Sequence, residues 1–481
     1  MEIKLQYPTN PEALDEMFLP NSFPREHYKE IFERLLSFSK EDLNEKENLS
    51  RISSLSQGIT FTVYNDGQGI ERIFPFDIIP RVIQKPEWDK IESGIVQRIT
   101  ALNLFLHDIY HEQNILKDKV IPSWLILESP EFIREMVGVD LPHQIHTHIS
   151  GIDLIRDANN EFCVLEDNLR TPSGVSYVLE NRIVMKKIFP EIFRENSVLR
   201  VDHYPQLLRE MLIKVAPHNK ENPTVVLLTP GIYNSAYYEH VFLAAQMGIQ
   251  IVEARDLLIQ DHKVYTKTIY GKKQVDVVYK RVDDAFIDPN VFRKDSLLGV
   301  PGLFEAFKRG NVNLVNAIGN GIADDKAIYA YVPKMIQYYL TEEPILKNIP
   351  TYLLFNDKDR DHVLKNMESM VVKATNQSGG YGMLIGRDST EESREKFKQM
   401  ILENPRNYIA QPTIALSTSP CFIEGAIEPR HVDLRPFAIY SPDGIKLIPG
   451  GLTRVALKKG SLVVNSSQGG GSKDTWVVNS A

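Results

Sequence analysis

Cysteine is scarce in this chain, since Cys163 and Cys421 are the only two cysteines among 481 residues. So few cysteines argue against a disulfide-stabilised scaffold and against a zinc site with cysteine ligands. We therefore expect a protein of the reducing cytoplasm. Positive charge is not in excess either. The formal net charge is -8, so the sequence predicts no broad basic surface and no nucleic-acid partner.

Long apolar runs are also missing from the sequence. No stretch approaches the length of a membrane-spanning helix, so no membrane partner is expected. The first residues lack a basic region followed by an apolar core, so no signal peptide is predicted. The composition is ordinary for a soluble globular protein, with 43% hydrophobic and 25% charged residues. A chain of this length should form roughly two to four subdomains, and these patterns do not predict its oligomeric state.

Apolar periodicity divides the chain into four regions. Residues 1–120 predict a largely helical N-terminal region without obvious chemistry. Residues 121–190 contain a predicted hairpin. Residues 220–320 alternate apolar strands with helices, which is typical of an open α/β unit with parallel strands. Residues 321–481 contain a glycine-rich stretch, a helix and several further strands.

The glycine-rich stretch VVKATNQSGGYGMLIG runs from Val371 to Gly386 and predicts a strand, a turn and a second strand. Its glycines, Gly379, Gly380 and Gly382, would let the backbone come close to a bulky anion, and Lys373 would add a point charge for phosphate oxygens. The stretch is not a P-loop, because no Gly-Lys-Ser/Thr closes it. The alternative interpretation is a glycine-rich hairpin with one exposed lysine.

An acidic pattern lies in a predicted hairpin that spans residues 145–167, with a turn of Asp-Ala-Asn-Asn at 157–160. The hairpin would bring Asp153 beside Glu166. Strand side chains alternate, so Glu166 and Asn168 should point to the same face. Two carboxylates and an amide oxygen form an all-oxygen set suited to Mg²⁺. The alternative is a solvated face of an ordinary hairpin.

Two other clusters carry less chemical signal. His143, His146 and His148 lie close together without a cysteine or acidic ligand at metal spacing, so we expect ordinary strand histidines. Lys272 and Lys273 follow a glycine and are expected on a solvated hairpin tip.

The pattern Asp-x12-Glu-x-Asn, followed by Thr-Pro-Ser-Gly, resembles the metal-binding end of ATP-grasp ligases such as D-alanine–D-alanine ligase. The stretch around Lys373 resembles the phosphate-covering loop of that family. Other similarities lie in the second half of the chain: Asp325-Lys326 at the start of a predicted long helix, the strand around Gln411, Asp433 and Arg435 in HVDLRPF, Arg454, and a segment with Asn465 and Gly469 to Gly471.

The order of these motifs is permuted, because the metal residues precede the lysines. This order is similar to that of the circularly permuted ATP-grasp proteins, which include glutathionylspermidine synthase. The resemblance implies an α/β ATP-grasp fold with an open α/β pre-ATP-grasp-like subdomain. It also implies that residues 145–180 pack into the same β-layer as residues 405–476.

The resemblance implies ATP and Mg²⁺ as cofactors, and it implies a role for each matching residue. The residues implied for ATP are Lys326, Lys373, Ser378, Gly379, Gly380, Tyr381, Gly382, Gln411 and Asp433. Those implied for the metal are Asp153, Glu166 and Asn168. Those implied for the substrate are Thr171, Ser173, Gly174, Asn465, Gly469 and Gly470. Guanidinium groups can bind a carboxylate or an acyl phosphate bidentately, so the candidate catalytic residues are Arg170, Arg435 and Arg454.

The implied activity is an ATP-dependent carboxylate–amine ligase. The carboxylate of a small molecule or peptide would attack the γ-phosphate, and an amine would displace phosphate from the acyl phosphate to give an amide. Such catalysis rests on positioning and electrostatics and needs no activated serine or cysteine. Two alternatives stay open, namely a catalytically silent ATP-binding scaffold or regulator and a phosphotransferase on the same fold. The sequence does not name the acid or the amine.

Overall fold

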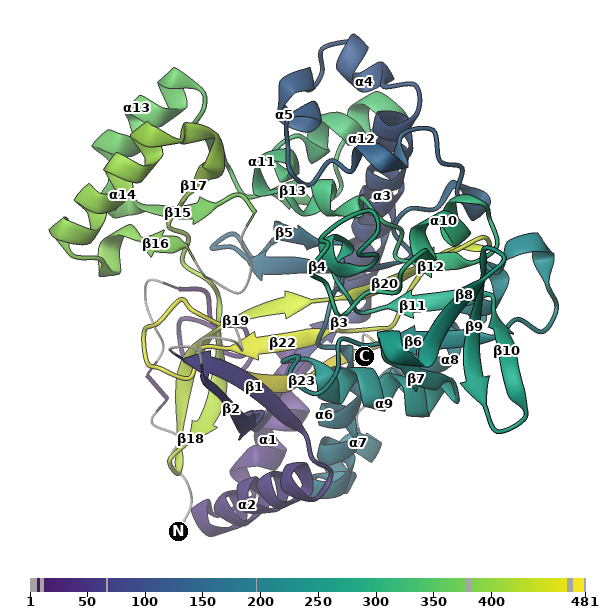
Figure 1. Cartoon of the computed structure of the whole chain (residues 1–481). Coiled ribbons are helices and arrows are strands. Elements are labelled where there is room, and N and C mark those ends of the chain that lie inside the picture. Colours follow the sequence, from purple (N-terminus) through teal and green to yellow (C-terminus); the bar gives the residue numbers. More distant parts are fainter. Residues whose placement is uncertain are drawn as a thin grey trace.

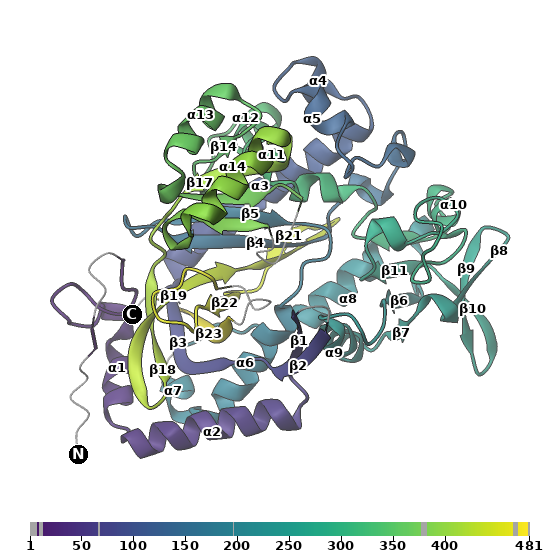
Figure 2. The ribbon, with the colours of Figure 1, turned by 60° about the vertical axis from the view of Figure 1, so that its left-hand side comes forward.

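The computed structural model describes residues 7–8, 13–65, 68–195, 197–376, 382–464 and 470–479. A large mixed sheet crosses the middle of the molecule (Figure 1). A small antiparallel sheet stands at one side of it, and a parallel sheet with its helices lies at the other side (Figure 2). We refer to these as the central sheet, the small sheet and the parallel sheet.

The central sheet has ten strands in the described chain, and its main order is β13-β5-β4-β19-β22-β23-β3. Three further strands join it at its margins, where β18 pairs with β19, and β20 pairs with β4 and β21. The strand bounds are β3 (Phe76–Gln84), β4 (Ile149–Arg156), β5 (Phe162–Asn168), β13 (Lys347–Asn348), β18 (Thr418–Ile423), β19 (Ala426–Arg435), β20 (Phe437–Ser441), β21 (Gly444–Leu447), β22 (Leu452–Val455) and β23 (Gly471–Val478).

The hairpin β4–β5 is confirmed, and Asp153 lies opposite Glu166 as expected, across a register shift that leaves Leu165 without a paired residue on β4. Strand β4 pairs in turn with β19 and β20, which come almost 300 positions later in the chain. The expected shared layer of residues 145–180 and 405–476 is thus confirmed for these strands. The hairpin itself begins at Ile149 rather than at the expected residue 145, because the preceding segment is irregular.

Helices cover both faces of the central sheet. Because side chains alternate along a strand, neighbours such as Val82 and Ile83 enter different cores. Ile83 packs in the core that contains helix α3 (Lys85–Tyr110). Val82 packs with residues of α1 and of α6 (Val175–Ile188) on the other face. A sheet buried on both faces gives the site a rigid base.

The small sheet has the order β14-β17-β15-β16. Its elements are β14 (Tyr352–Leu353), β15 (Met370–Ala374), β16 (Met383–Ile385) and β17 (Tyr408–Pro412), with α13 (Asp357–Lys365) and α14 (Glu391–Glu403) packed on it. The predicted strand–turn–strand is confirmed, since Val371 pairs with Ile385 in antiparallel register. The turn residues Ser378, Gly379, Gly380 and Tyr381 lie outside the described residues.

The parallel sheet has the order β12-β11-β6-β7, and all its pairs are parallel, as the sequence predicted. Its elements are β6 (Val225–Leu228), β7 (Gln250–Val252), β11 (Val277–Lys280) and β12 (Asn313–Val315), with helices α8 (Tyr204–Lys214), α9 (Tyr237–Met247) and α10 (Leu303–Lys308). A separate antiparallel sheet follows β7 and comprises β8 (Leu257–Gln260), β9 (Lys263–Thr268) and β10 (Gly271–Val275). Lys272 and Lys273 are exposed at the start of β10, as expected.

The remaining elements lie mostly in the N-terminal region and around residue 330. They are α1 (Lys29–Leu36), α2 (Lys40–Ser56), β1 (Thr60–Asn65), β2 (Gln68–Ile73), α4 (Asn114–Lys117), α5 (Ser123–Leu127), α7 (Pro190–Glu195), α11 (Lys326–Tyr329) and α12 (Val332–Leu340). Short 3-10 helices lie at Glu26–Tyr28, Arg134–Met136, Pro142–Gln144, Pro217–Asn219, Ala254–Asp256, Asp284–Phe286, Asn320–Asp324, Met367–Ser369, Gly386–Asp388 and Pro405–Asn407.

Three sequence-based expectations differ from the structure. The long helix expected from Lys326 is wrong, because α11 ends at Tyr329 and α12 begins separately with Pro333 in its first turn. His146 and His148 precede β4 instead of lying in a strand, and both are buried. The N-terminal region, expected to be largely helical, also supplies β3 to the central sheet.

Both cysteines are buried and unpaired, in accordance with the absence of a disulfide scaffold. Within the described ranges, no helix has both the length and the apolar composition needed to span a bilayer.

Candidate functional site

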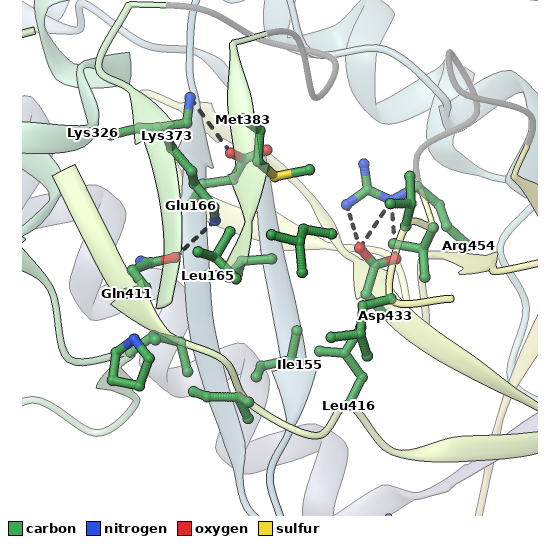
Figure 3. A pocket seen from close by; sticks show the side chains of 18 of the residues that line it. Ile155, Leu165, Glu166, Lys326, Lys373, Met383, Gln411, Leu416, Asp433 and Arg454 are labelled. Atoms are coloured by element: carbon green, nitrogen blue, oxygen red, sulfur yellow. Dashed lines mark hydrogen bonds and ion pairs between the residues drawn. The ribbon is translucent and has the colours of Figure 1, made fainter. Parts of the chain in front are cut away.

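The main cavity lies between the central sheet and the small sheet, and it has an empty volume of about 970 Å³ including its open mouth (Figure 3). One end of it is charged and the other end is apolar. The charged and polar lining residues are Glu166, Lys326, Lys373, Gln411, Asp433 and Arg454. The apolar lining residues include Ile155, Leu165, Ile349, Val371, Met383, Ile385, Ile414, Leu416 and Leu462. An apolar slot beside clustered cations suits a ligand with a flat ring and an anionic tail.

Lys373 reaches the cavity from β15, and its ammonium group donates a 2.8 Å hydrogen bond to Oε1 of Gln411 on β17. The amide of Gln411 donates to the hydroxyl of Thr351 at 3.1 Å, so the amide is held from both ends. Burial lowers the pKa of Lys373 to about 8, with Glu166 opposing the shift and Lys326 adding to it. An anion bound here would favour the charged form of this lysine.

Lys326 is placed by the first turn of α11. Asp325 caps that helix by accepting from the backbone N–H of Ala327 at 2.8 Å, and Arg406 donates to the other Asp325 oxygen at 2.7 Å. The ammonium nitrogen of Lys326 lies 3.7 Å from a Glu166 oxygen. Lys326 and Lys373, which are 47 positions apart in the numbering of the chain, thus line the same cavity (Figure 3).

Four charged side chains form a continuous network at the floor of the cavity. Arg454 donates to both oxygens of Asp433, at 2.9 and 3.0 Å, and also to Asp153 at 2.6 Å. Arg435 donates to the same Asp153 carboxylate, at 2.8 Å through Nη2. Asp153 and Asp433 are completely buried. Burial by itself would raise the pKa of Asp153, but the two guanidinium groups bring the pKa well below its usual value.

Burial also acts on Asp433, but there the arginines do not outweigh it. It raises the pKa of Asp433, and Arg454 opposes the shift only in part while the negative charge of Asp153 adds to it. Both aspartates thus bind Arg454, but the pKa of Asp153 is lowered whereas the pKa of Asp433 is raised.

The contacts that the predicted Mg²⁺ ligands already make show which of them could also bind a metal ion. Glu166 has cationic neighbours at the long distances of 3.7 Å and 4.0 Å, and Nδ2 of Asn168 is buried without a hydrogen-bond partner. The Glu166 carboxylate therefore has capacity for a further cation. Oδ1 of Asn168 is an oxygen of the type that suits Mg²⁺, whereas its unpartnered Nδ2 can only donate a hydrogen bond. Asp153 differs, because its Oδ1 accepts from Arg435 and its Oδ2 accepts from both Arg435 and Arg454. Among the residues described, no three His, Cys, Asp or Glu side chains are grouped for a metal ion, so phosphate oxygens would have to complete the shell.

Arg170 lies in a second, smaller cavity that shares Glu166 and Lys326 with the first. Its guanidinium is 3.3 Å from Glu131 and 3.3 Å from Asp324. Burial raises the pKa of Asp324 to about 6 against the opposing effect of Arg170, and burial also raises the pKa of Glu131. Arg170 is thus fixed by two carboxylates at the edge of the main cavity.

Sequence reasoning did not single out Glu131 or Asp324. Asp324 was detectable as the neighbour of the Asp325-Lys326 motif, whereas Glu131 lies in a stretch without any motif. Of the predicted substrate residues, Thr171 and Ser173 are partly buried in the turn between β5 and α6, and Gly174 is buried there. Gly470 is buried just before β23, and Gly382 is exposed next to β16. Asn465 and Gly469 lie outside the described residues.

Comparison with known proteins identifies the family of this chain. The family model described as circularly permuted ATP-grasp type 2 matches residues 80–456. This chain belongs to that family. The family assignment and the α/β ATP-grasp fold therefore agree with the resemblance seen in the sequence.

Several relatives match nearly the whole chain. An uncharacterised protein of Synechocystis sp. is 53% identical over 96% of this chain and 96% of its own length. An uncharacterised protein of Mycobacterium tuberculosis is 50% identical over 97% of this chain and 84% of its own length. A Frankia casuarinae protein named "Putative glutamate--cysteine ligase 2-2" is 38% identical over 97% of this chain, which spans only 54% of that protein.

A solved structure shares the fold at low sequence identity. It is the apo form of a glutathione synthetase-like effector from Globodera pallida, with a TM-score of 0.61 and 10% identity. The similarity covers 92% of this chain and 98% of the effector. At this identity the comparison supports the fold alone.

Proposed function

We propose that the chain is a Mg²⁺-dependent and ATP-dependent ligase that joins a carboxylate to an amine through an acyl phosphate. The observation that carries this proposal is the single cavity in which Lys326, Lys373 and Arg454 converge beside the carboxylate of Glu166. Lys326 and Lys373 come from separate segments of the chain and favour an anionic ligand here, whereas Arg454 is already paired with Asp433 and Asp153. The carboxylate of Glu166 beside the two lysines favours a cation that accompanies the anion.

The apolar end of the cavity supports a nucleotide as the anionic ligand. Side chains from both sheets and from the segment between β17 and β18, such as Ile155 on β4, Met383 on β16 and Leu416, line an apolar slot (Figure 3). An adenine ring would be buried in that slot, and the phosphates would extend toward Lys326 and Lys373. Gln411 would then hold Lys373 in its extended position, as it does in the structure.

In the proposed reaction Lys326 and Lys373 bind phosphate oxygens and orient the γ-phosphate. Glu166 and Asn168, with Asp153 beside them, would hold Mg²⁺. That ion would offset the negative charge that develops on the transferring group. Arg170, Arg435 and Arg454 would orient the substrate carboxylate and stabilise the acyl phosphate through bidentate hydrogen bonds. The incoming amine attacks the acyl carbon in its neutral form, phosphate leaves with the electron pair of the C–O bond, and the proton lost from the nitrogen passes to water or to the departing phosphate.

The relatives support a ligase in general terms. A name that includes glutamate–cysteine ligase belongs to proteins of which this chain matches about half, so the acid and the amine of this chain are left open. We propose that the reacting carboxylate belongs to a small molecule or a peptide. The cytoplasmic location stays a prediction.

A direct test is a phosphate-release screen. The protein is incubated with ATP and Mg²⁺ and with pooled amino acids, peptides and polyamines, and products are identified by mass spectrometry. We expect an amide product and ADP in equal amounts with at least one pool. A phosphorylated acceptor without an amide would instead indicate a phosphotransferase, and ATP binding without any product would indicate a scaffold.

The matched variants for this screen lie on the same hairpin. Glu166→Gln should lose most phosphate release, because the carboxylate next to the phosphates is gone. Glu161→Gln should retain it, because the Glu161 side chain is 41% exposed next to the turn of the hairpin and pairs with surface lysines at 3.3 and 3.4 Å. Equal phosphate release by both variants would show that Glu166 is not part of the catalytic site.

A further inference from the structure

The turn Thr171–Gly174 is held by a buried ion pair from a different part of the molecule. Glu239 belongs to α9 and Arg281 follows β11, so both come from the parallel sheet and its helices. They are 1% and 5% exposed, respectively, and their side chains lie 3.2 Å apart. Neither residue lines the main cavity or matches a motif recognised in the sequence.

The pair lies at the edge of the parallel sheet where sheets of this kind usually bind their ligands. β7 lies on one side of β6 and β11 lies on the other, so the strand order reverses between β6 and β11. Arg281 follows the carboxyl end of β11, and its backbone N–H donates to the carbonyl of Leu228 at the end of β6. Crevices at such reversal points are the typical functional edge of α/β sheets. Here the edge faces the turn that leads from the predicted metal residues into α6.

The contacts between the pair and the turn are numerous and direct. One oxygen of Glu239 accepts from the backbone N–H of Gly174 at 2.7 Å and from the backbone N–H of Ser176 at 3.1 Å. The same oxygen accepts from the hydroxyl of Ser176 at 3.0 Å. Arg281 donates to the carbonyl of Pro172 at 2.8 Å. The Glu239 carboxylate thus occupies the N-terminus of α6, where a negative charge is favourable.

The same turn also contacts Arg435, which belongs to the charged network below the main cavity. The carbonyl of Ser173 accepts from Nη1 of Arg435 at 3.3 Å. The same guanidinium binds Asp153 and lies 4.0 Å from Glu166. The turn also packs closely against β22, because the φ of Gly174 is 116° and a Cβ there would lie 2.8 Å from Leu452, so a larger residue would not fit. A rigid connection therefore runs from Glu239 and Arg281 through the turn to Arg435.

We propose that Glu239 and Arg281 are positioning residues for Arg435, which they hold in the orientation that stabilises the transferring phosphoryl group. This inference rests on the proposed ligase function. A buried ion pair contributes little net stability, and an apolar pair of similar size often serves the fold as well. The pair is therefore better explained by the geometry that it imposes on the turn than by the stability that it adds.

The test uses an apolar double variant, because either single variant would leave a buried charge without a partner. Glu239→Met/Arg281→Met removes both charges together. The control is Arg182→Met/Asp474→Leu, which removes another buried pair that lies on α6 and β23. The pair Arg182–Asp474 has an N–O distance of 2.8 Å, and its other hydrogen bonds go to Leu199, Thr475 and Trp476.

Binding is measured by calorimetry with Mg²⁺–ADP, alone and together with aluminium fluoride as a mimic of the transferring phosphoryl group. In the wild type and the control, aluminium fluoride should tighten Mg²⁺–ADP binding at least tenfold. In Glu239→Met/Arg281→Met the affinity for Mg²⁺–ADP alone should stay within threefold of the wild type, while the tightening is lost. A merely structural role would weaken both measurements together or neither.

The possible results separate this inference from the proposed function. If the double variant retains the full tightening, Glu239 and Arg281 do not position Arg435 and the inference is overturned. If it loses Mg²⁺–ADP affinity and tightening in parallel with lower thermal stability, the role is structural and the inference is also overturned. If the wild type does not bind Mg²⁺–ADP at all, the proposed function fails, and the positioning role fails with it.

Discussion

The wall of the main cavity that belongs to the central sheet differs from the wall that belongs to the small sheet in how its charges are satisfied. On the central sheet, Asp153 and Asp433 are completely buried and are bound by Arg435 and Arg454. On the small sheet, the hydrogen bond of the Lys373 ammonium group goes to a neutral amide. Only the first wall therefore holds charges that already compensate one another.

This difference indicates a structural role for the charges of the central sheet and a binding role for the lysine of the small sheet. Charges that are paired and buried cannot be removed singly without leaving an uncompensated partner in the interior. Lys373 has its pKa lowered by burial, so an incoming anion would relieve an unfavourable state. We infer that the central sheet supplies a fixed frame and that the small sheet supplies an adaptable cation. The predictions below test this contrast in order of expected effect.

The largest effect is expected for Arg454→Met. This change leaves Asp153 with Arg435 alone and removes the arginine that binds Asp433. The free energy of unfolding should fall by about 3–5 kcal/mol, as measured by urea denaturation. The matched change on the other wall, Lys373→Met, should alter it by less than about 1 kcal/mol. Equal effects of the two variants would contradict the contrast between the walls.

The segment that leads into β4 should make the stability of the central sheet dependent on pH. His148 is 1% exposed, both of its ring nitrogens lack hydrogen-bond partners, and burial lowers its pKa from 6.5 to about 3. The unfolded chain therefore binds the proton more tightly, and stability falls as the pH drops from 6.5 toward 3. The contribution of His148 should be about 1.4 kcal/mol per pH unit in this window.

This contribution can be isolated by a difference measurement. Asp324 acts in the opposite direction, because its pKa is raised to about 6, so the slope of the wild type alone is a sum of several groups. Urea denaturation at several pH values should show a smaller slope for His148→Leu than for the wild type. An unchanged slope would mean that His148 is protonated in the folded state or is not buried.

The sequence located the hairpin of the central sheet well. The spacing of Asp153 and Glu166 around a turn was sufficient to predict that they lie side by side, but the register shift that places them opposite each other was not predicted. The permuted order of motifs was enough to predict that this hairpin joins β19 and β20. This pairing could be predicted because each of the two segments carries its own recognisable motif.

The sequence did not reveal the contacts that complete the site. Nothing in the residues around Glu131, Glu239 or Arg281 marks them as neighbours of Arg170 or of the turn that follows β5, because these contacts arise only when distant segments pack together. The ion pairing of Asp153 was likewise hidden, since a carboxylate looks the same in sequence whether it will face a cation or an arginine. The break after Lys326 coincides with Pro333, which lies in the first turn of α12, where proline is favoured; the expectation of one long helix did not include this signal.

On the small sheet, Lys373→Met should weaken ATP binding at least tenfold without unfolding the protein. The ammonium group lies in the cavity beside Lys326, and its removal takes away a cation that the phosphates would contact. Calorimetry gives the affinity, and circular dichroism confirms that the variant is folded. Unchanged ATP affinity in a folded variant would rule out the phosphate role of this lysine.

The smallest effect concerns the pH dependence of ATP binding. The pKa of Lys373 is about 8 in the free protein, so the fraction that carries a charge falls as the pH rises above 8. The dissociation constant for ATP should then increase by up to about tenfold per pH unit between pH 8 and 10. In Lys373→Arg this increase should vanish, because a guanidinium stays charged throughout the range. An identical increase in both proteins would assign the titration to another group.

The central claim, a Mg²⁺–ATP site formed by both walls, is tested most directly by calorimetric titration of ATP with and without Mg²⁺. We predict that Mg²⁺ strengthens ATP binding to the wild type and to the control Glu161→Gln. In Glu166→Gln, ATP should still bind, but most of the strengthening by Mg²⁺ should be lost, because the carboxylate closest to the two lysines is neutral. The account would be contradicted if Mg²⁺ strengthened ATP binding equally in Glu166→Gln, or if the folded wild type bound no ATP under either condition.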